Sequence, residues 1–304
     1  MTSASIHPYA AGDYARALAD GTGAALEVTE WGSFVLAREI PPHGPGGPTG
    51  LRDAMGVYPM TPIRAQADLA AGLGRLGDEG LVSVVLVPDP LASPDEGRLA
   101  AAFDLCRPFK THYLVDRARG HFAPSKHHRA EIRRAQRRCC IELVRLTDHL
   151  PAWTQLYDGL MERHAVAGVA AFREAYFVAL SSEPRMTTLV AYVGDEIGAM
   201  AIWFEHAGVA NNHLGASNAL GYANGASYAL YDAAIAHFSQ AAVFNLGGGA
   251  GARDDPSDGL AVFKRGFANA EARAMLCGAV LDEARYAALS HGLPPTGYFP
   301  SYRG

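Results

Sequence analysis

One stretch in the second half of the chain restricts the fold more than any other. Three runs of apolar and small residues over 186–217 are separated by turns at Gly194 and Gly208, which predicts three consecutive antiparallel strands. The apolar residues of 221–240 recur with the helical period, so one long amphipathic helix is predicted there. A short strand is predicted over 243–246. This order of strands and helix indicates an α/β fold.

The first 120 residues hold a less regular set of predicted elements. Strands are predicted within 24–40, over 81–90 and at the end of 103–116, and a helix over 64–79. Residues 41–63 are dense in proline and glycine, which excludes a helix or a central strand and predicts a long loop. Long loops inside compact domains are more often functional than accidental.

A strongly basic segment opens the second half of the chain. Residues 125–138 predict a helix with Ser125 as its N-cap. Arg129 and Arg133 are four residues apart and therefore lie on one helix face, with Lys126 one turn earlier. A strand over 141–146 and helices over 151–164 and 171–180 are predicted next.

Composition limits the classes of protein to which the chain can belong. A length of 304 residues with 49% hydrophobic residues predicts two domains of about 150 residues each. The net charge of −5 excludes a globally basic nucleic-acid coat, and no contact with DNA is expected, so phosphate binding would need a local basic patch. The four cysteines lack metal spacing, so we expect no metal and a reduced, cytoplasmic protein. Neither a signal peptide nor 18 consecutive apolar residues is present, so no membrane insertion is expected.

Five segments, taken in order and spacing, resemble one known family. They are the basic helix at 126–135, HLGAS at 213–217, the helix after GYANGAS, FNLGGG at 244–249 and DGLAVFKRGF at 258–267. Together they resemble the FemAB/FemX-like branch of the GNAT acyltransferase superfamily, also described as BioF2-like. The resemblance covers residues 120–285.

The resemblance implies tandem GNAT-like domains, each a mixed, mostly antiparallel twisted sheet flanked by helices. A degenerate N-terminal domain is expected over 1–120 and a FemAB-like domain over 121–285. The tail, residues 286–304, contains aromatic residues between prolines, and we expect it to pack back on the body.

Fem-type proteins transfer an aminoacyl group from aminoacyl-tRNA to an amine, on a cell-wall precursor or a small natural product. The resemblance therefore implies an aminoacyltransferase that needs no cofactor. The alternative is an N-acyltransferase that uses acyl-CoA or an acyl carrier as co-substrate, and a third hypothesis is a silent binding protein with this fold. Residues 219–225 depart from the acetyl-CoA loop pattern, which favours the tRNA donor.

The glycine run at 247–249 is not a nucleotide-binding P-loop, because the GxxxxGK[ST] pattern is absent. It predicts a tight turn or a place where substrate approaches the backbone at Gly248. The resemblance implies that Phe263 and Lys264, in a glycine-rich turn, face the transferred carbonyl. Aminolysis places negative charge on that oxygen, so Lys264 would stabilise it and Phe263 would orient it. The structural alternative is a surface Lys-Arg pair at a strand end.

The remaining candidates would contact substrates. Lys126, Arg129 and Arg133 would hold a phosphate of the acceptor or of tRNA, or would form a solvated helix face. Other candidates are Asp53 and Tyr58 in an acceptor groove or a proline-ordered turn, His213 as a base or a core residue, and Tyr222 and Asn224 against either substrate. Asp258 would take a proton from the attacking ammonium or belong to a solvated acidic turn.

Overall fold

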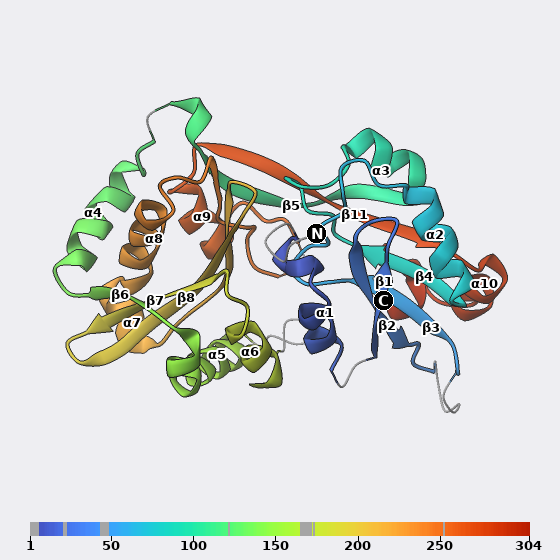
Figure 1. Cartoon of the computed structure of the whole chain (residues 1–304), viewed down its shortest axis with the longest axis horizontal. Coiled ribbons are helices and arrows are strands. Elements are labelled where there is room, and N and C mark those ends of the chain that lie inside the picture. Colours follow the sequence, from blue (N-terminus) through green and yellow to red (C-terminus); the bar gives the residue numbers. More distant parts are fainter. Residues whose placement is uncertain are drawn as a thin grey trace. The chain divides into compact units, whose positions relative to one another are not determined.

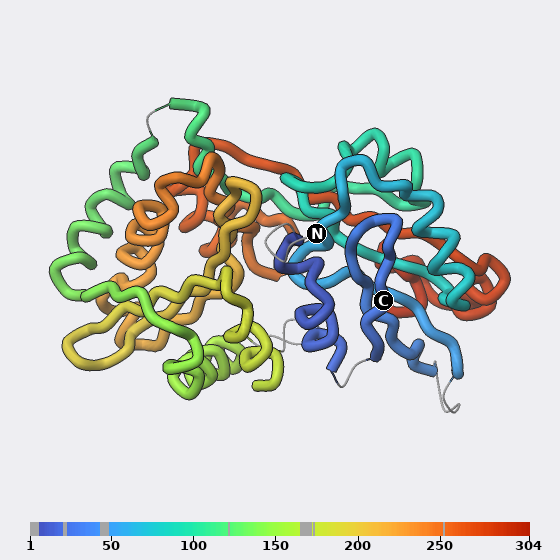
Figure 2. The backbone as a smooth tube through the Cα atoms, in the orientation of Figure 1, coloured from blue at the N-terminus to red at the C-terminus, as the bar shows by residue number. Residues whose placement is uncertain are grey.

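Figures 1 and 2 show a computed structural model of the chain, which describes residues 6–20, 23–42, 49–120, 122–164, 172, 174–251 and 253–304. The chain divides into two compact units: unit 1 comprises Met1–Phe109 and Arg273–Gly304, and unit 2 comprises Lys110–Ala272. The sequence predicted divisions after residues 120 and 285 instead. The difference arises because β5 (Leu105–Asp116) and β11 (Ala270–Val280) each contribute residues to both units.

Unit 1 is a mixed sheet flanked by helices. Its strands are β1 (Ala24–Val28), β2 (Ser33–Glu39), β3 (Arg52–Gly56) and β4 (Leu81–Leu86), followed in the sheet by the last residues of β11. Strands β3 and β4 are parallel, and the other neighbours are antiparallel. Its helices are η2 (Pro8–Ala10), α1 (Gly12–Ala19), α2 (Leu69–Asp78), α3 (Glu96–Ala102), α10 (Glu283–Ser290) and η6 (Ser301–Arg303). Trp31, Leu76 and Val84 belong to its core.

Strand β3 lies inside the segment predicted as a loop, so that prediction is wrong for residues 52–56. Residues 43–48 of the same segment lie outside the described residues. Strand β3 pairs with β2 on one side and β4 on the other, so its backbone groups find partners from both. The local proline and glycine content predicted a loop because those partners come from other parts of the chain.

The end of the chain packs on unit 1. The Tyr302 side chain is buried, and its hydroxyl lies 2.7 Å from Oγ of Ser83 in β4. Arg303 donates hydrogen bonds to the Asp53 carboxylate in β3. These contacts connect the last residues to two strands that are more than 200 positions earlier in the chain.

Unit 2 contains the predicted meander, which is confirmed. Its strands are β7 (Met186–Val193), β8 (Glu196–His206) and β9 (Val209–Ser217), and β6 (Cys140–Val144) adds to β7. On the other side of the meander, β10 (Val243–Asn245) pairs parallel with β9 and antiparallel with β5. The sheet is therefore mixed and mostly antiparallel, as expected.

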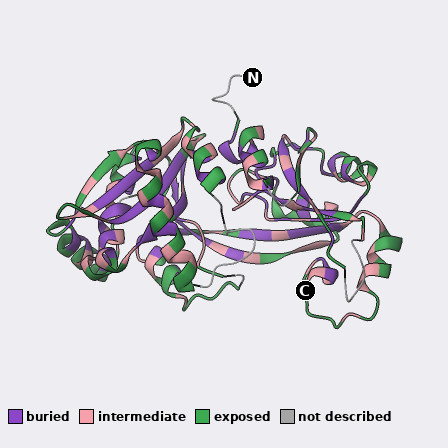
Figure 3. Cartoon of the chain, turned by 90° about the horizontal axis from the view of Figure 1, so that it is seen from below, coloured by how far each residue is buried: buried purple, intermediate pink, exposed green. Residues whose placement is uncertain are grey.

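The helices of unit 2 cover this sheet. They are α4 (Lys126–Gln136), α5 (Leu150–His164), α6 (Glu174–Ser181), α7 (Ala219–Asn224), α8 (Ala226–His237) and α9 (Gly259–Arg265), with short turns η3 (Arg117–Arg119) and η4 (Leu146–His149). Ser125 caps α4 as predicted, since its Oγ accepts from the amide of His128 at 3.2 Å. Residues 171 and 173 of one predicted helix lie outside the described residues. Figure 3 shows buried residues along the strands and exposed residues on the helices.

The long helix predicted over 221–240 is two helices. Gly225 separates α7 from α8 in a left-handed conformation, with φ of 70°. Gly221 of α7 lies against β8: a Cβ atom there would be 2.1 Å from the carbonyl oxygen of Gly198. Gly221 therefore allows α7 to approach the strand closely, and α8 begins after the left-handed Gly225. The sequence prediction treated residues 221–240 as one helix and did not place a break at Gly225.

Candidate active site

Lys264 lies on a helix and is buried. Helix α9 begins after Asp258, whose Oδ2 accepts a hydrogen bond from the amide of Ala261 at 3.0 Å. The Lys264 side chain is 7% exposed, and its Nζ donates to the carbonyl oxygen of Gly248 at 2.8 Å. Both the predicted glycine-rich turn and the alternative of an exposed strand end are therefore wrong for this residue. The helix was missed because it is only seven residues long and carries no extended apolar period.

Burial changes the protonation of Lys264. Removal from water lowers its pKa to about 7, the attraction of Asp258 opposes the shift, and the repulsion of Lys110 adds to it. Within the described part of the chain, Lys264 forms no ion pair with a carboxylate within 4.0 Å. An ammonium without a close counter-ion is available to a developing negative charge.

A second buried lysine was not predicted. Lys110 on β5 is 8% exposed, and its Nζ donates to the carbonyl oxygens of Ala250, at 2.9 Å, and Arg253. One signal in the sequence could have indicated it. Lysine occurs three times among the 26 Lys and Arg residues, at positions 110, 126 and 264. Because lysine is rare here and its pKa shifts readily on burial, each of the three was a candidate for a specific role.

Both lysines hold the segment 247–251, which we call the glycine loop. Gly247 has φ of 76°, which favours glycine at this turn. The carboxylate of Asp258 accepts from the amide of Ala250 at 3.0 Å as well as capping α9. Partial burial alone would raise the pKa of Asp258, but hydrogen bonds from backbone amides outweigh it and lower the pKa. Asp258 is therefore a charged structural group and a poor proton acceptor at neutral pH.

Phe263 belongs to an aromatic cluster beside the loop. Its ring centroid lies 4.9 Å from that of Tyr231 and 5.0 Å from that of Tyr228, both on α8. The carbonyl oxygen of Phe263 lies 2.8 Å from Nε2 of the buried His128, whose Nδ1 lies 3.0 Å from Oγ of Ser125. Because a carbonyl only accepts, Nε2 carries the proton in this contact. The cluster holds Phe263 by packing, and its neighbour Lys264 is positioned with it.

Among the described residues, β9 has no strand partner on the β10 side beyond Asn211. Recorded pairing between them ends at Asn211 and Asn245, whereas β9 continues to Ser217 alongside β8. The Asn245 side chain donates to Oδ1 of Asn211 at 3.0 Å and accepts from the amide of Gly247 at 2.9 Å. This contact joins the strand end to the glycine loop. These asparagines were not predicted as site residues, because they belong to no recognisable sequence motif.

His213 lies two residues after Asn211 on β9. Its Nε2 lies 2.6 Å from the hydroxyl of Tyr176 on α6, and burial lowers its pKa to about 3. The imidazole is therefore neutral throughout the physiological range. This arrangement agrees with the core interpretation of His213, because a ring with so low a pKa is a weak base.

Most of the other predicted contacts in unit 2 lie on its surface, and Asn224 is half-buried. Lys126, Arg129 and Arg133 are exposed on α4, and Nη1 of Arg129 donates to the carbonyl of Pro124 at 2.6 Å. Tyr222 on α7 is 56% exposed, and the Arg163 guanidinium lies 4.8 Å from its ring centroid. The side chain of Asn224 donates back to the carbonyl of Leu220 within its own helix. No contact joins this group to Lys264 among the bonds recorded for the described residues.

Two predicted contacts lie in unit 1. Asp53 is fully buried and accepts hydrogen bonds from Arg38, at 2.9 Å, and from Arg303. The Asp53 carboxylate is therefore occupied by two arginines of the protein itself. We correct the expectation that it lines an acceptor groove. Tyr58 is half-buried, and its carbonyl accepts from the hydroxyl of Tyr14 at 2.5 Å.

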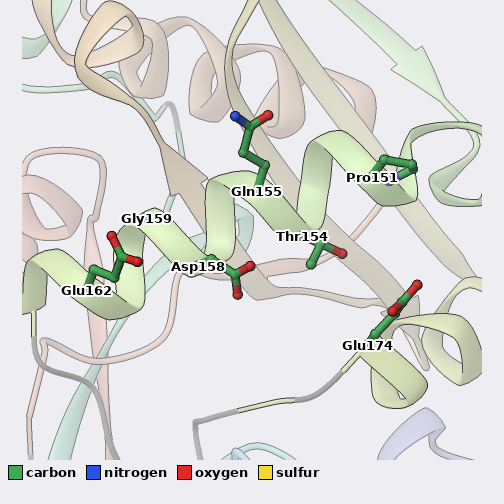
Figure 4. Close-up of a pocket in the computed structure, with 7 residues that line it drawn as sticks. All are labelled: Pro151, Thr154, Gln155, Asp158, Gly159, Glu162 and Glu174. Atoms are coloured by element: carbon green, nitrogen blue, oxygen red, sulfur yellow. The ribbon is translucent and has the colours of Figure 1, made fainter.

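An open groove of about 610 Å³ lies elsewhere in unit 2, along α5 and α6. Figure 4 shows the side chains of Thr154 and Asp158 on the side of α5 that faces Glu174. The residues that line it are Pro151, Thr154, Gln155, Asp158, Gly159, Glu162 and Glu174. None of the residues predicted from the sequence lines this groove. Among the described residues, no group of three or more His, Cys, Asp or Glu is placed to hold a metal ion.

Comparison with solved structures identifies the fold. No protein-family profile matches the sequence, and no curated protein sequence matches it. The C-terminal domain of a putative lysylphosphatidylglycerol synthetase from Agrobacterium fabrum is similar, with a TM-score of 0.61 at 17% identity over 91% of this chain and 89% of that one. The structure of FemX has a TM-score of 0.55 at 11% identity over 91% and 98%. The chain has a Fem-like fold.

A third structure supports the same fold. L-PGS from Bacillus licheniformis has a TM-score of 0.57 at 14% identity, over 92% of this chain and 94% of that one. The Fem-like fold thus extends over nearly the whole chain and is not confined to residues 120–285, which the sequence resemblance covered. Within the described residues, no helix is both long and apolar enough to cross a membrane.

Proposed function

We propose that this protein is an aminoacyltransferase, which moves an aminoacyl group from aminoacyl-tRNA to the amine of a small acceptor. The observation that carries the proposal is the buried Lys264, which contacts the glycine loop and has no close counter-ion among the described residues. The Fem-like fold supports the reaction class, since the resemblance implies acyl transfer by Fem-type proteins.

The chemistry follows from the charge that the reaction creates. The amine nitrogen of the acceptor attacks the ester carbonyl, the N–C bond forms, and the C–O bond to the tRNA ribose breaks. Negative charge develops on the carbonyl oxygen as the nitrogen attacks. The Lys264 ammonium stabilises this charge, and burial strengthens the interaction because little water screens it.

The donor would be held through its phosphates by α4. Lys126, Arg129 and Arg133 are exposed there, and the recorded ion pair of this helix joins Arg134 to Glu131 at 3.6 Å, which leaves the three candidate cations outside it. Cations on one helix face fit the repeated phosphates of an RNA backbone. The acceptor would supply a neutral amine next to the glycine loop.

One feature favours tRNA over acyl-CoA as the donor. In a CoA site, free amides at a helix start hold the pyrophosphate. Here the amide of Gly221 at the start of α7 already donates to Oδ1 of Asn218 at 2.9 Å. One amide that could bind a CoA phosphate is therefore already occupied, which supports the tRNA donor.

The donor can be determined directly. Purified protein is incubated with a mixture of charged tRNAs and a set of primary amines, with and without ribonuclease, and in parallel with acyl-CoA and a thiol reagent. We expect amide product that disappears after ribonuclease treatment, without release of free thiol. Release of thiol with ribonuclease-resistant product would establish the acyl-CoA alternative. Tight binding without product from either donor would indicate a silent binding protein.

A further inference from the structure

The three lysines of the chain are not spread over its surface. Lys126 is exposed at the start of α4, whereas Lys110 and Lys264 are both buried and both bind the backbone near the glycine loop. They come from different elements, β5 and α9, that are about 150 residues apart in sequence. Burying two cations beside one short loop is costly, so the pair requires a physical explanation.

The two ammonium groups have different surroundings. Lys110 donates to two carbonyl oxygens, those of Ala250 and Arg253, whereas Lys264 has one recorded acceptor, the carbonyl of Gly248. An ammonium has three N–H groups, so Lys110 is better satisfied as a cation than Lys264. A carbonyl can also accept from a neutral amine, and the Gly248 contact therefore holds Nζ of Lys264 in place in either protonation state.

The charged groups around the two lysines also favour a proton on Lys110 more than on Lys264. Asp254 and Asp258 both favour the protonated form of Lys110, whereas Asp258 alone favours that of Lys264, and Lys110 opposes it. Burial lowers the pKa of both lysines, and it lowers that of Lys264 to about 7. Geometry and electrostatics thus distinguish one lysine that keeps its proton from another that can release it.

We propose that Lys110 and Lys264 act as an unequal pair, in which Lys110 keeps its proton and holds the glycine loop while Lys264 exchanges its proton during transfer. Lys110 is a positioning residue in this pair, and the inference rests on the proposed function. Neutral Lys264 takes the proton that the attacking nitrogen loses as the N–C bond forms. The resulting ammonium faces the oxyanion, and the proton leaves with the departing oxygen when the C–O bond breaks. No net proton is gained or lost by the enzyme.

The small number of lysines allows a direct test. Protein labelled with ¹³C at the lysine side chains shows three ε signals, which are assigned with the variants Lys110→Arg, Lys126→Arg and Lys264→Arg and titrated by NMR. We expect the Lys264 midpoint to lie near neutrality and the Lys126 midpoint to serve as an exposed reference. In Lys110→Met the Lys264 midpoint should rise by about one pH unit, and in Lys110→Arg, which keeps the charge, it should stay in place. A Lys264 midpoint that is the same in Lys110→Met as in wild type would overturn the pair.

Kinetics separates this inference from the proposed function. The acid limb of kcat should have its midpoint at the Lys264 value and move upward with it in Lys110→Met. If the NMR midpoint moves and the acid limb does not, proton exchange by Lys264 is wrong although the enzyme transfers acyl groups. If no donor gives product at any pH, the proposed function is wrong. If Lys110→Met still raises the Lys264 midpoint in that case, the NMR titration supports the electrostatic interaction between the two lysines independently of the function.

Discussion

Nε2 of His128 lies 2.8 Å from the carbonyl oxygen of Phe263, the residue that precedes Lys264 on α9. His128 itself is on α4, between Lys126 and Arg129, the cations proposed to hold the donor. One hydrogen bond therefore joins the proposed phosphate-binding helix to the helix that carries the proposed catalytic ammonium. Burial lowers the pKa of His128 and outweighs the hydrogen bond to the Phe263 carbonyl, which raises it.

Because α4 packs closely against the end of α9, we predict that one methyl group added at Gly266 lowers the stability of the protein. A Cβ atom at Gly266 would lie 2.0 Å from Cε1 of His128, so Gly266→Ala should destabilise the protein by about 1–3 kcal/mol. Denaturant unfolding of Gly266→Ala, and of Gly266→Ala combined with His128→Ala, would measure this, and removal of the ring should recover part of the loss. The matched control is Gly159→Ala in α5, where nothing lies within 4 Å and no loss is expected. Equal stability of the two alanine variants would contradict the close fit.

Replacement of Lys264 tests the proposed chemistry. Lys264→Met removes the ammonium, and loss of one such stabilising group costs about 10²–10³-fold in kcat. Its neighbour Arg265 is exposed on the same helix, so Arg265→Ala is the control and should keep nearly full activity. Rates are measured by amide formation from charged tRNA, with circular dichroism as the check of folding. A folded Lys264→Met variant with wild-type kcat would remove Lys264 from the mechanism.

The lowered pKa of Lys264 also predicts how stability depends on pH. The folded value is about 7 and the ordinary lysine value is 10.5, so between them the unfolded state binds more protons. The free energy of unfolding contributed by Lys264 therefore rises with pH from about 7 to about 10.5 and is constant outside this window. Relative to Lys264→Met, wild type should gain a few kcal/mol over that range, on the order set by the pKa shift. Urea unfolding of both proteins at several pH values provides the comparison. Parallel pH profiles would show that the pKa of Lys264 is not lowered in the folded protein.

The basic face of α4 predicts a salt-dependent donor affinity. Each of Arg129→Ala and Arg133→Ala should weaken binding of charged tRNA and lower the slope of log K against log salt by about 1. The control is Arg145→Ala, which removes another exposed arginine of unit 2 that lies outside α4. Filter binding or fluorescence anisotropy at several salt concentrations measures the slope. A tRNA affinity that does not change with salt concentration, or an equal loss of affinity in Arg145→Ala, would contradict tRNA binding by this helix face.

Asp53 should contribute to stability and not to catalysis. Its buried carboxylate pairs with Arg38 and Arg303, so Asp53→Asn should lower the free energy of unfolding by about 3 kcal/mol. Activity per folded molecule should be unchanged, because no exposed atom of Asp53 is left for a substrate. Thermal unfolding and a transfer assay on the same preparation check both statements. A stable Asp53→Asn variant with a raised KM for the amine would restore the acceptor-groove interpretation.

Much of the fold and part of the candidate site follow from local sequence signals. The meander over 186–217 is predicted because alternation and turn glycines are properties of neighbouring residues. The cap at Ser125 is also local, since its hydroxyl bonds an amide three residues later. Phe263 and Lys264 were named from the sequence by resemblance. By itself, then, the sequence determined the three-stranded meander of the second half, the basic helix and the choice of the candidate lysine.

Only the tertiary structure decided the state of that lysine. Strand β3 forms because β2 and β4 pair with it, and α7 is separated from α8 because Gly221 meets Gly198. In the same way, Lys264 is buried because α9 packs beside the glycine loop, and Lys110 reaches that loop from a strand about 140 residues earlier. Burial and electrostatic coupling depend on partners that are distant in the chain, and a local pattern carries no information about their distance in space.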